Sequence, residues 1–376
     1  MNFKNLLFVL FIAVVFISGC TQQQAAGNEN QETGKADSQP DKPVQGGTTT
    51  GTTAAKEKKP LAKELPITER GFLIGMAGFI PKNHPQSSEA DWKDLFDRLP
   101  ESGELFGVYS GWNDTLVENI PQQVHTAFGL AEQKKIIPIV AIGFEPDSLS
   151  QEEADNYVKN NGEGFKSTAV AIAEKFRPKY LALGVEINRY YEKSPAGFAD
   201  FVALYRETFD AIKNASPGTK VFTVFQVEYM KGGGKLSDAE HTKHWEIIRE
   251  FEDKLDLVGF TVYPFLDYAT PGEIPDGYLA EIKQFTDKPV IITETGWPSE
   301  EIAGIPATEE SQKEYLIRLL GLTQELELEA IVWILPHDTS VAAGNGLFNH
   351  LSLRKNNGQE KQAFGYWQAL LEIKKQ

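Results

Sequence analysis

Two glutamates in this chain occupy positions from which a pair of carboxyl groups could act on one bond. Glu186 lies in Leu-Gly-Val-Glu-Ile-Asn at 183–188, and Glu294 lies in Ile-Thr-Glu-Thr-Gly-Trp-Pro-Ser at 292–299. Each glutamate ends an apolar, β-branched run just before a turn, which is typical of the end of a buried strand. Two carboxyl groups in one water-poor cleft can differ in pKa, so that one serves as an acid and the other as a nucleophile. Cleavage of a glycosidic bond needs this pair.

The elements that must position these glutamates are predicted from apolar runs that alternate with amphipathic stretches. Strands are predicted at 71–78, 104–110, 136–143, 179–186, 220–226, 256–263, 289–294 and 330–335. Helices are predicted at 89–99, 121–133, 163–176, 196–214, 239–254, 276–286 and 308–327, with a last helix at 360–373. This order predicts an α/β fold, a (β/α)8 TIM barrel over residues 67–376. A doubly wound sheet also fits the alternation, but no Gly-x-Gly-x-x-Gly turn opens its first helix.

Strand alternation relates the two glutamates in space. It places residues 182, 184 and 186 on one face of the fourth strand, and Val290, Ile292 and Glu294 on one face of the seventh. If both faces point inward, the side chains of Glu186 and Glu294 face each other across the barrel mouth. The alternative is that each is a satisfied buried acid or a helix-cap partner.

Polar and aromatic residues gather at the predicted strand ends, which form the functional face of such a barrel. Aromatic rings can stack on sugar rings, whereas amides and carboxylates can bind hydroxyl groups. Some of these residues could instead be core residues of the rim, and Glu145 and Glu228 could pair with rim lysines. The residues are Phe79, Tyr109, Trp112, Phe144, Glu145, Asn188, Gln226, Glu228, Tyr263, Trp297, Trp333, His337 and Asp338.

Three strings carry a resemblance to a known group of enzymes. The segment from 71 to 373 resembles clan A of the retaining (β/α)8 glycoside hydrolases, with the nearest echoes in family 17 β-glucanases and family 53 galactanases. Thr293-Glu294-Thr295-Gly296-Trp297-Pro298-Ser299 resembles the family 17 nucleophile string. Gly184-Val185-Glu186-Ile187-Asn188 resembles the acid/base string, and Thr261-Val262-Tyr263-Pro264-Phe265 resembles the strand-six string.

The resemblance implies roles for individual residues. Glu294 would be the nucleophile and Glu186 the acid/base. Tyr263 would donate a hydrogen bond to the nucleophile, and Trp333 would stack on a sugar. Trp112, Trp297 and Glu228 are expected to add substrate contacts because they lie at predicted strand ends, and no metal or organic cofactor is implied.

One departure from the clan affects the sugar site. The clan usually has Asn directly before the acid/base glutamate, where it contacts the substrate 2-hydroxyl, and this chain has Val185. Asn188 would share a face with Glu186 if the strand ran on, and could supply the missing contact. Otherwise the chain has a different sugar subsite or has lost activity.

The N-terminal residues predict export and anchoring. Residues 1–20 read as a lipoprotein signal peptide, because Lys4 and a short apolar stretch precede the lipobox Ile17-Ser18-Gly19-Cys20. Cys20 is the only cysteine and would carry the lipid that holds the protein on a bilayer. An uncleaved N-terminal anchor is the alternative. Residues 21–66 are predicted to be a disordered tether, because they are poor in large apolar residues.

The remaining features exclude other classes of function. The net charge of −16 argues against a nucleic-acid partner. His241 and His244 lie on a predicted helix, but they lack the His-Glu-x-x-His pattern of zinc enzymes. The glycines at 232–234 are not followed by the Lys-Ser/Thr pair of a phosphate loop.

The sequence thus predicts a monomeric, extracytoplasmic prokaryotic lipoprotein that is a retaining O-glycoside hydrolase. Its expected substrate is a β-linked poly- or oligosaccharide. Two alternatives remain open: a catalytically silent carbohydrate-binding lipoprotein, and a transglycosylase that remodels surface polysaccharide with the same glutamates. The fold alone cannot separate them.

Overall fold

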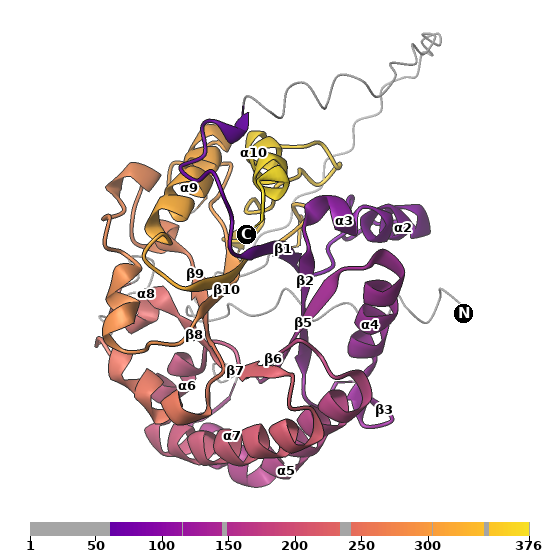
Figure 1. Ribbon diagram of the computed structural model, residues 1–376, viewed down its shortest axis with the longest axis vertical. Coiled ribbons are helices and arrows are strands. Elements are labelled where there is room, and N and C mark those ends of the chain that lie inside the picture. Colours follow the sequence, from indigo (N-terminus) through magenta and orange to yellow (C-terminus); the bar gives the residue numbers. More distant parts are fainter. Residues whose placement is uncertain are drawn as a thin grey trace, which may run out of the picture.

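The protein is described by a computed structural model over residues 61–114, 116–144, 149–233, 242–302, 304–341 and 346–375 (Figure 1). The predicted signal peptide, the lipidation site Cys20, most of the predicted tether, Glu145 and His241 lie outside these residues.

Parallel strands form the centre of the molecule. Nine strands pair in the order β7-β6-β5-β2-β1-β11-β10-β9-β8, counting the described residues. Their bounds are β1 Leu73–Ala77, β2 Leu105–Gly111, β5 Ile137–Gly143, β6 Tyr180–Leu183, β7 Lys220–Phe222, β8 Val224–Gln226, β9 Val258–Val262, β10 Val290–Thr295 and β11 Leu328–Trp333. The two edge strands, β7 and β8, are halves of one predicted strand interrupted at Thr223, so the sheet comes back on itself as the predicted (β/α)8 TIM barrel.

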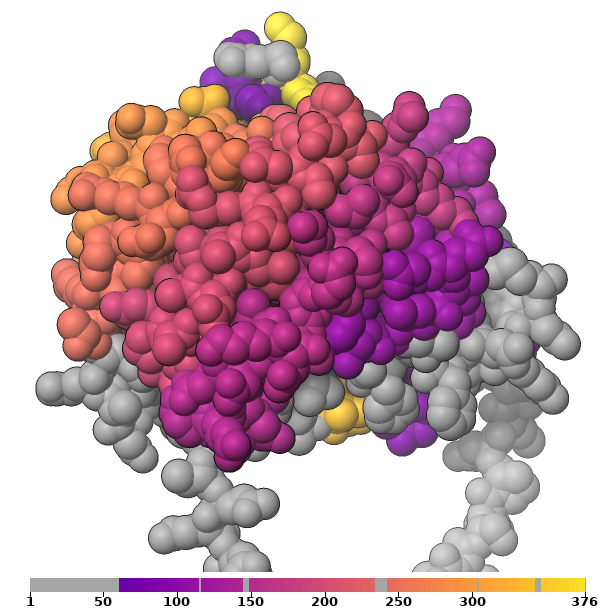
Figure 2. Space-filling view, turned by 90° about the horizontal axis from the view of Figure 1, so that it is seen from below, coloured from indigo at the N-terminus to yellow at the C-terminus, as the bar shows by residue number. Residues whose placement is uncertain are grey.

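Helices surround the strands (Figure 1). The α-helices are α2 Glu89–Asp97, α3 Leu99–Ser102, α4 Gln122–Lys134, α5 Gln151–Phe176, α6 Ile187–Lys193, α7 Pro195–Ala215, α8 Val227–Met230, α9 Glu309–Leu322 and α10 Gln362–Glu372. The long helices α5 and α7 pack together and cover one side of the barrel, the side seen in Figure 2. A small antiparallel hairpin, β3 Leu116–Val117 and β4 Ile120–Pro121, precedes α4.

Two predicted helices are wrong. The segment predicted as a helix at 239–254 contains the 3-10 turns η3 Trp245–Glu250 and η4 Glu252–Lys254 in its described part. The segment predicted at 276–286 contains only η7 Ala280–Gln284, and the shorter 3-10 turns η5 Pro264–Leu266 and η6 Pro271–Glu273 precede it. Trp245, Ile248 and Phe251 are buried at a spacing of three, which suits a 3-10 turn as well as an α-helix. The core, rather than helix propensity, sets the local winding here.

The predicted strand 179–186 is too long. The strand β6 ends at Leu183, because Gly184 and Glu186 have φ angles of +82° and +50°. An alanine at 184 would place its Cβ 2.5 Å from the Ile187 side chain, so only glycine fits this turn without displacement. The chain therefore leaves the sheet three residues earlier than the apolar pattern predicts.

The two ends of the barrel meet on the side away from the strand carboxyl ends. The Arg70 N–H group donates to the Lys374 carbonyl at 3.0 Å, and Arg70 bridges Lys375 in parallel. Residues 61–66, which the sequence assigns to the tether, pack against the barrel instead. Leu65 is buried, and the Tyr366 hydroxyl donates to Glu64 at 2.5 Å. In the described part of the chain, no helix has the length and apolar character needed to cross a bilayer.

Candidate active site

Glu294 lies at the carboxyl end of β10, beside a β-bulge. From Ile292 to Glu294 the strand advances two residues while its neighbour β9 advances one, from Phe260 to Thr261. A bulge places an extra residue in one strand and re-aims the side chains beyond it. Glu294 is only partly exposed, and burial raises the pKa of its carboxyl group to about 7. A carboxyl group held near neutrality at a strand end is a frequent property of functional sites.

Tyr263 provides the one described hydrogen bond to Glu294. The Tyr263 hydroxyl donates to Glu294 Oε2 at 2.9 Å, and this bond lowers the Glu294 pKa against the effect of burial. Tyr263 follows β9 and is fully buried, with Phe265 and Phe348 packed edge-on against its ring. Burial and the nearby charge of Glu294 hold the Tyr263 pKa well above its usual range. The tyrosine therefore stays a donor at any physiological pH.

Glu186 lies at the turn between β6 and α6, in the left-handed conformation. A left-handed glutamate is uncommon, because its Cβ crowds the backbone, and such residues cluster at functional sites. Its side chain is 8% exposed, and both of its oxygens have partners. The Thr261 hydroxyl donates to Oε1 at 2.8 Å, and the Arg189 guanidinium donates to Oε2 at 3.0 Å.

Glu186 and Glu294 both contact one short stretch of β9. Thr261, which donates to Glu186, is the direct strand neighbour of Glu294 in the β9–β10 register. Tyr263, two residues further along, donates to Glu294, and its pKa is raised by the charges of both Glu294 and Glu186. Glu186 and Glu294 therefore both contact β9 at the barrel mouth, and β7, β8 and β9 lie between β6 and β10 in the strand order.

Asn188 is occupied by the protein backbone. Its Oδ1 accepts from the Gln226 N–H group at 2.9 Å, and its Nδ2 donates to the Gln226 carbonyl at 3.1 Å. It is fully buried and lies on α6, because the strand does not run on to residue 188. The predicted contact between Asn188 and the sugar 2-hydroxyl is replaced by a link that ties α6 to the end of β8.

Trp297 and Trp333 are core residues. Both indoles are fully buried, and the Trp333 Nε1–H group donates to the Leu351 carbonyl at 2.6 Å. Trp297 packs on Phe265 and Tyr315, whereas Trp333 packs on Tyr315 and Trp367. Neither ring offers a face to a sugar, so core packing takes the place of the predicted stacking role.

Trp112 is directed toward the outer helix α5. Its Nε1–H group donates to the Tyr157 hydroxyl at 2.8 Å. A methyl group added at Gly164 of α5 would come within 2.4 Å of the Trp112 ring. The indole is partly exposed, so it can belong to the rim but does not lie between the two glutamates.

Glu228 follows β8 on α8 and is fully buried, although the sequence predicts it at the open end of the barrel. Its Oε1 accepts from the Tyr263 N–H group and from the Tyr278 hydroxyl, each at 2.8 Å. Burial raises the Glu228 pKa to about 8. This arrangement replaces the predicted direct contact between Glu228 and substrate, and among the described residues no rim lysine pairs with Glu228.

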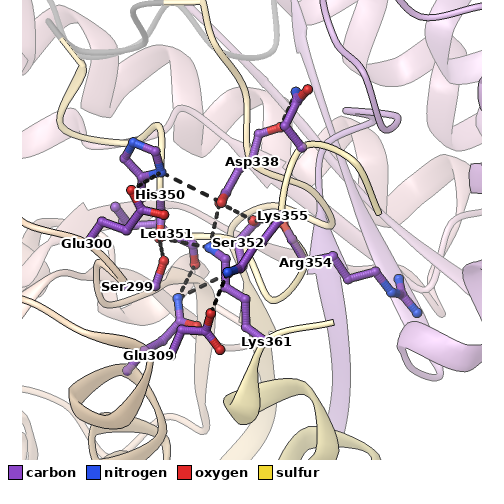
Figure 3. Close-up of polar contacts among 12 residues, drawn as sticks. Ser299, Glu300, Glu309, Asp338, His350, Leu351, Ser352, Arg354, Lys355 and Lys361 are labelled. Atoms are coloured by element: carbon purple, nitrogen blue, oxygen red, sulfur yellow. Dashed lines mark hydrogen bonds and ion pairs between the residues drawn. The ribbon is translucent and has the colours of Figure 1, made fainter. Parts of the chain in front are cut away.

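The loop after β11 is held by a buried polar cluster, which we name the Asp338 clamp: Asp338, His350, Ser352 and Lys361 (Figure 3). Lys361 donates to Asp338 Oδ1 at 2.7 Å and to the His350 carbonyl at 3.2 Å. The Ser352 hydroxyl also donates to Asp338 Oδ1.

The Asp338 clamp supports the candidate site from behind. It fixes the strand-end loop containing Phe348 and Leu351, the residues that contact Tyr263 and Trp333. Gln312 of α9 reinforces this loop, because its amide donates to the carbonyls of Trp297, Leu351 and Ser352.

Sequence reasoning missed Thr261 and Arg189. Thr261 is two residues before Tyr263, so strand alternation could have placed both on one face. Arg189 is three residues after Glu186, the spacing at which neighbouring helical side chains meet. The described residues contain no group of three or more His, Cys, Asp or Glu side chains that could hold a metal ion; His244 is buried, with its Nδ1 2.5 Å from the Thr242 carbonyl.

Comparison with known proteins identifies the fold. No protein-family model and no curated protein matches the sequence. Solved structures do match: the GH5_18 protein of Streptomyces cattleya, in complex with GlcNAc, has a TM-score of 0.58 at 15% identity, over 80% of each chain.

Two further barrels are similar to the same extent. An exo-β-1,4-mannosidase from Opitutaceae bacterium strain TAV5 has a TM-score of 0.59 at 14% identity, over 81% of this chain and 60% of that one. A family 1 β-glucosidase from Thermotoga maritima has a TM-score of 0.56 at 13% identity, over 81% of this chain and 98% of that one. At such identities the likeness establishes a shared (β/α)8 barrel, and function must be argued from the site.

Proposed function

We propose that the protein is an O-glycoside hydrolase that cleaves a β-linked poly- or oligosaccharide with retention of configuration. The observation that carries the proposal is the placement of Glu294, bonded to the Tyr263 hydroxyl, beside Glu186 over β9. The similar barrels named above as a mannosidase and a glucosidase support the same reaction class.

The proposed reaction has two displacements. In the first, the Glu294 carboxylate attacks the anomeric carbon, the glycosidic C–O bond breaks, and the leaving oxygen takes a proton from Glu186. In the second, Glu186 takes a proton from water as the water oxygen attacks the same carbon, and Glu294 leaves as a carboxylate. Each step balances without a metal or an organic cofactor.

The electrostatics set the pH range of this chemistry. Glu294 must be ionised to attack, and its pKa is about 7, so activity should rise as the pH increases through about 7. Glu186 must be protonated for the first step, and in the described structure its Oε2 pairs with the Arg189 guanidinium at 3.0 Å.

The same ion pair favours one alternative. A barrel that binds carbohydrate without cleaving it has no need of a protonated Glu186, and it tolerates Val185 and a backbone-bound Asn188. Transglycosylation would use the same two glutamates with a sugar hydroxyl in place of water. Product analysis separates it from hydrolysis.

The decisive experiment identifies a substrate and then determines the anomeric configuration of the first product. The protein is screened against aryl β-glycosides of glucose, mannose, galactose and N-acetylglucosamine, and against β-linked polysaccharides. Proton NMR of the first product formed should show the β-anomer. The Glu186→Ala variant should lose turnover. Added azide should restore turnover, because azide can attack the glycosyl-enzyme without a general base, and the product should be a β-glycosyl azide. An α-anomer as first product would exclude retention, and binding without turnover would select the silent barrel.

We also propose that the protein is a lipoprotein held outside the cytoplasmic membrane through Cys20. The lipobox sequence supports this proposal. Cys20→Ser should release the protein from membranes of its native host. A variant that stays membrane-bound with an intact N-terminus would instead make the apolar segment the anchor.

A further inference from the structure

Glu228 is a buried acid with no role in the two displacements. It lies on α8 directly after β8, is fully buried, and forms no ion pair among the described residues. Its Oε1 accepts two hydrogen bonds at 2.8 Å, from the Tyr263 N–H group and the Tyr278 hydroxyl. Its Oε2 is buried without a hydrogen-bond partner in the described structure.

A chain of contacts connects this acid with the candidate nucleophile. Glu228 holds the backbone of Tyr263, and the Tyr263 hydroxyl holds Glu294 Oε2 at 2.9 Å. Phe348 and Phe265 pack edge-on against the same ring, so the ring has little freedom to compensate for a shift of the Tyr263 backbone. A small rotation about the Tyr263 backbone would carry its hydroxyl away from Glu294, because the hydroxyl lies at the far end of the side chain.

The described surroundings of Glu228 supply no compensating cation. Asp267, an acid, acts on it electrostatically, and the other ionisable neighbours in the described structure are Tyr263, Tyr268, Tyr278 and Tyr315. The nearby Lys231 lies over the Tyr278 ring and pairs with Glu281. An ionised carboxylate in such a place is strongly disfavoured, since burying a charge without a partner is costly.

We propose that Glu228 is a positioning residue for the reaction at Glu294: as an uncharged acid it fixes the backbone of Tyr263, and thereby the hydroxyl that orients the nucleophile. This inference rests on the proposed function only for its catalytic consequence. The structural part, the hold of Glu228 on Tyr263, is independent of any activity.

The test uses two substitutions that differ in one property. Glu228→Gln keeps the accepting oxygen and the neutral state, whereas Glu228→Leu removes both hydrogen bonds and leaves the Tyr263 N–H group unpaired. Tyr205→Phe is the matched control, because it removes one hydrogen bond of a buried tyrosine, to the Lys254 carbonyl, outside the site.

Amide hydrogen exchange tests whether Glu228 holds the Tyr263 backbone. The peptide that contains Tyr263 should stay protected in Glu228→Gln and in Tyr205→Phe, and should lose protection in Glu228→Leu. Equal protection in all of these variants would overturn the proposal. Raising the pH from 4.5, the ordinary value for a glutamate, to about 8 should progressively destabilise the native protein, because over this range the unfolded chain releases the Glu228 proton that the native state retains, while Glu228→Gln should be spared this loss.

The catalytic consequence is tested by steady-state kinetics with an aryl β-glycoside that the protein cleaves. Glu228→Gln should keep kcat within about 3-fold, whereas Glu228→Leu should lower kcat by about 10-fold to 100-fold with little change in KM. In a Tyr263→Phe background, Glu228→Leu should have no further effect on kcat, because its route to Glu294 is already cut. A full additional loss in that background would overturn the route through Tyr263.

The two proposals fail in different ways. If no glycoside is cleaved by the native protein, the hydrolase proposal fails and hydrogen exchange still decides the hold on Tyr263. If glycosides are cleaved but the two Glu228 variants behave alike in both measurements, the positioning role fails and the hydrolase proposal stands.

Discussion

Two groups of buried carboxyl groups in this barrel are treated in opposite ways by their neighbours. In the Asp338 clamp, the acid is neutralised by a buried lysine at 2.7 Å and by a serine hydroxyl. At the mouth, Glu294 and Glu228 receive hydrogen bonds but no cation among the described residues, and burial raises their pKa values to about 7 and about 8.

The difference separates structural from chemical use of an acid. A buried ion pair that is hydrogen-bonded on both sides can fix a loop. A buried acid without a cation has a raised pKa, so its protonation state can be used by the site: Glu294 is proposed to act when ionised, and Glu228 when uncharged. Glu186 lies between these cases, because it has Arg189 as a partner and a strained backbone at the mouth.

Glu294→Gln should have the largest effect on turnover. The amide keeps the shape and the bond from Tyr263 but cannot attack a sugar, so turnover should fall by on the order of 10³-fold or more. Binding of a cleaved oligosaccharide, measured by calorimetry, should change little. Unchanged turnover would move the chemistry away from Glu294.

Lys361→Met tests the other side of the comparison. Removing the lysine leaves Asp338 buried and unpaired, so the free energy of unfolding should fall by about 3–5 kcal/mol. Urea denaturation measures this loss. The double variant Lys361→Met with Asp338→Asn should recover part of it, because no unpaired charge remains. A loss of under about 1 kcal/mol would place this pair among weakly contributing surface pairs.

Tyr263→Phe removes the hydrogen bond to Glu294 at the barrel mouth. The Tyr263 hydroxyl lowers the Glu294 pKa, so its removal should raise that pKa above about 7. Since Glu294 acts when ionised, the acid limb of the pH profile of kcat/KM should move to higher pH. The rate at the optimum should fall by about 10-fold. An acid limb that stays in place would mean that another group controls it.

His350→Gln should give the smallest effect. Pairing with the Asp338 carboxylate raises the His350 pKa, so the contact stabilises the fold below about pH 6.5 and fades as the pH rises through the raised value. The variant should therefore lower Tm at pH 5.5 and leave it unchanged at pH 8.5. The loss should be under about 1 kcal/mol, because the imidazole is partly exposed and 3.7 Å from Asp338. An equal loss at both pH values would assign His350 a packing role only.

Local patterns in the sequence were sufficient for the barrel strands. All eight predicted strands are confirmed, because buried parallel strands are continuous apolar runs that need no distant information. The end of β6 was misplaced, since the positive φ of Glu186 depends on how the turn packs and leaves no mark in its residue type. The helices predicted at 239–254 and 276–286 failed because core contacts overrode helical periodicity.

The site was predictable in part for the same reason. The positions of Glu186 and Glu294 follow from strand ends, but the contacts of the other predicted residues depend on segments far along the chain. Trp333 is buried by a loop that continues to residue 354, and Asn188 is held by the end of β8. No local pattern encodes these long-range contacts, so strand-end position alone overestimated how many of the predicted site residues are accessible; Asn188, Glu228, Trp297 and Trp333 are buried.

The meeting of Arg70 with Lys374 and Lys375 has a consequence for the order of the chain itself. A short peptide could join these two ends without disturbing a strand, and the chain could be opened instead in the exposed β3–β4 hairpin at Glu118 and Asn119. Domains whose ends adjoin commonly tolerate such circular permutation. Synthesis of the permuted chain would begin with β4 and end with β3, yet Glu186 and Glu294 would still both contact β9. The barrel thus depends on which strands are neighbours in space rather than on which of them is made first.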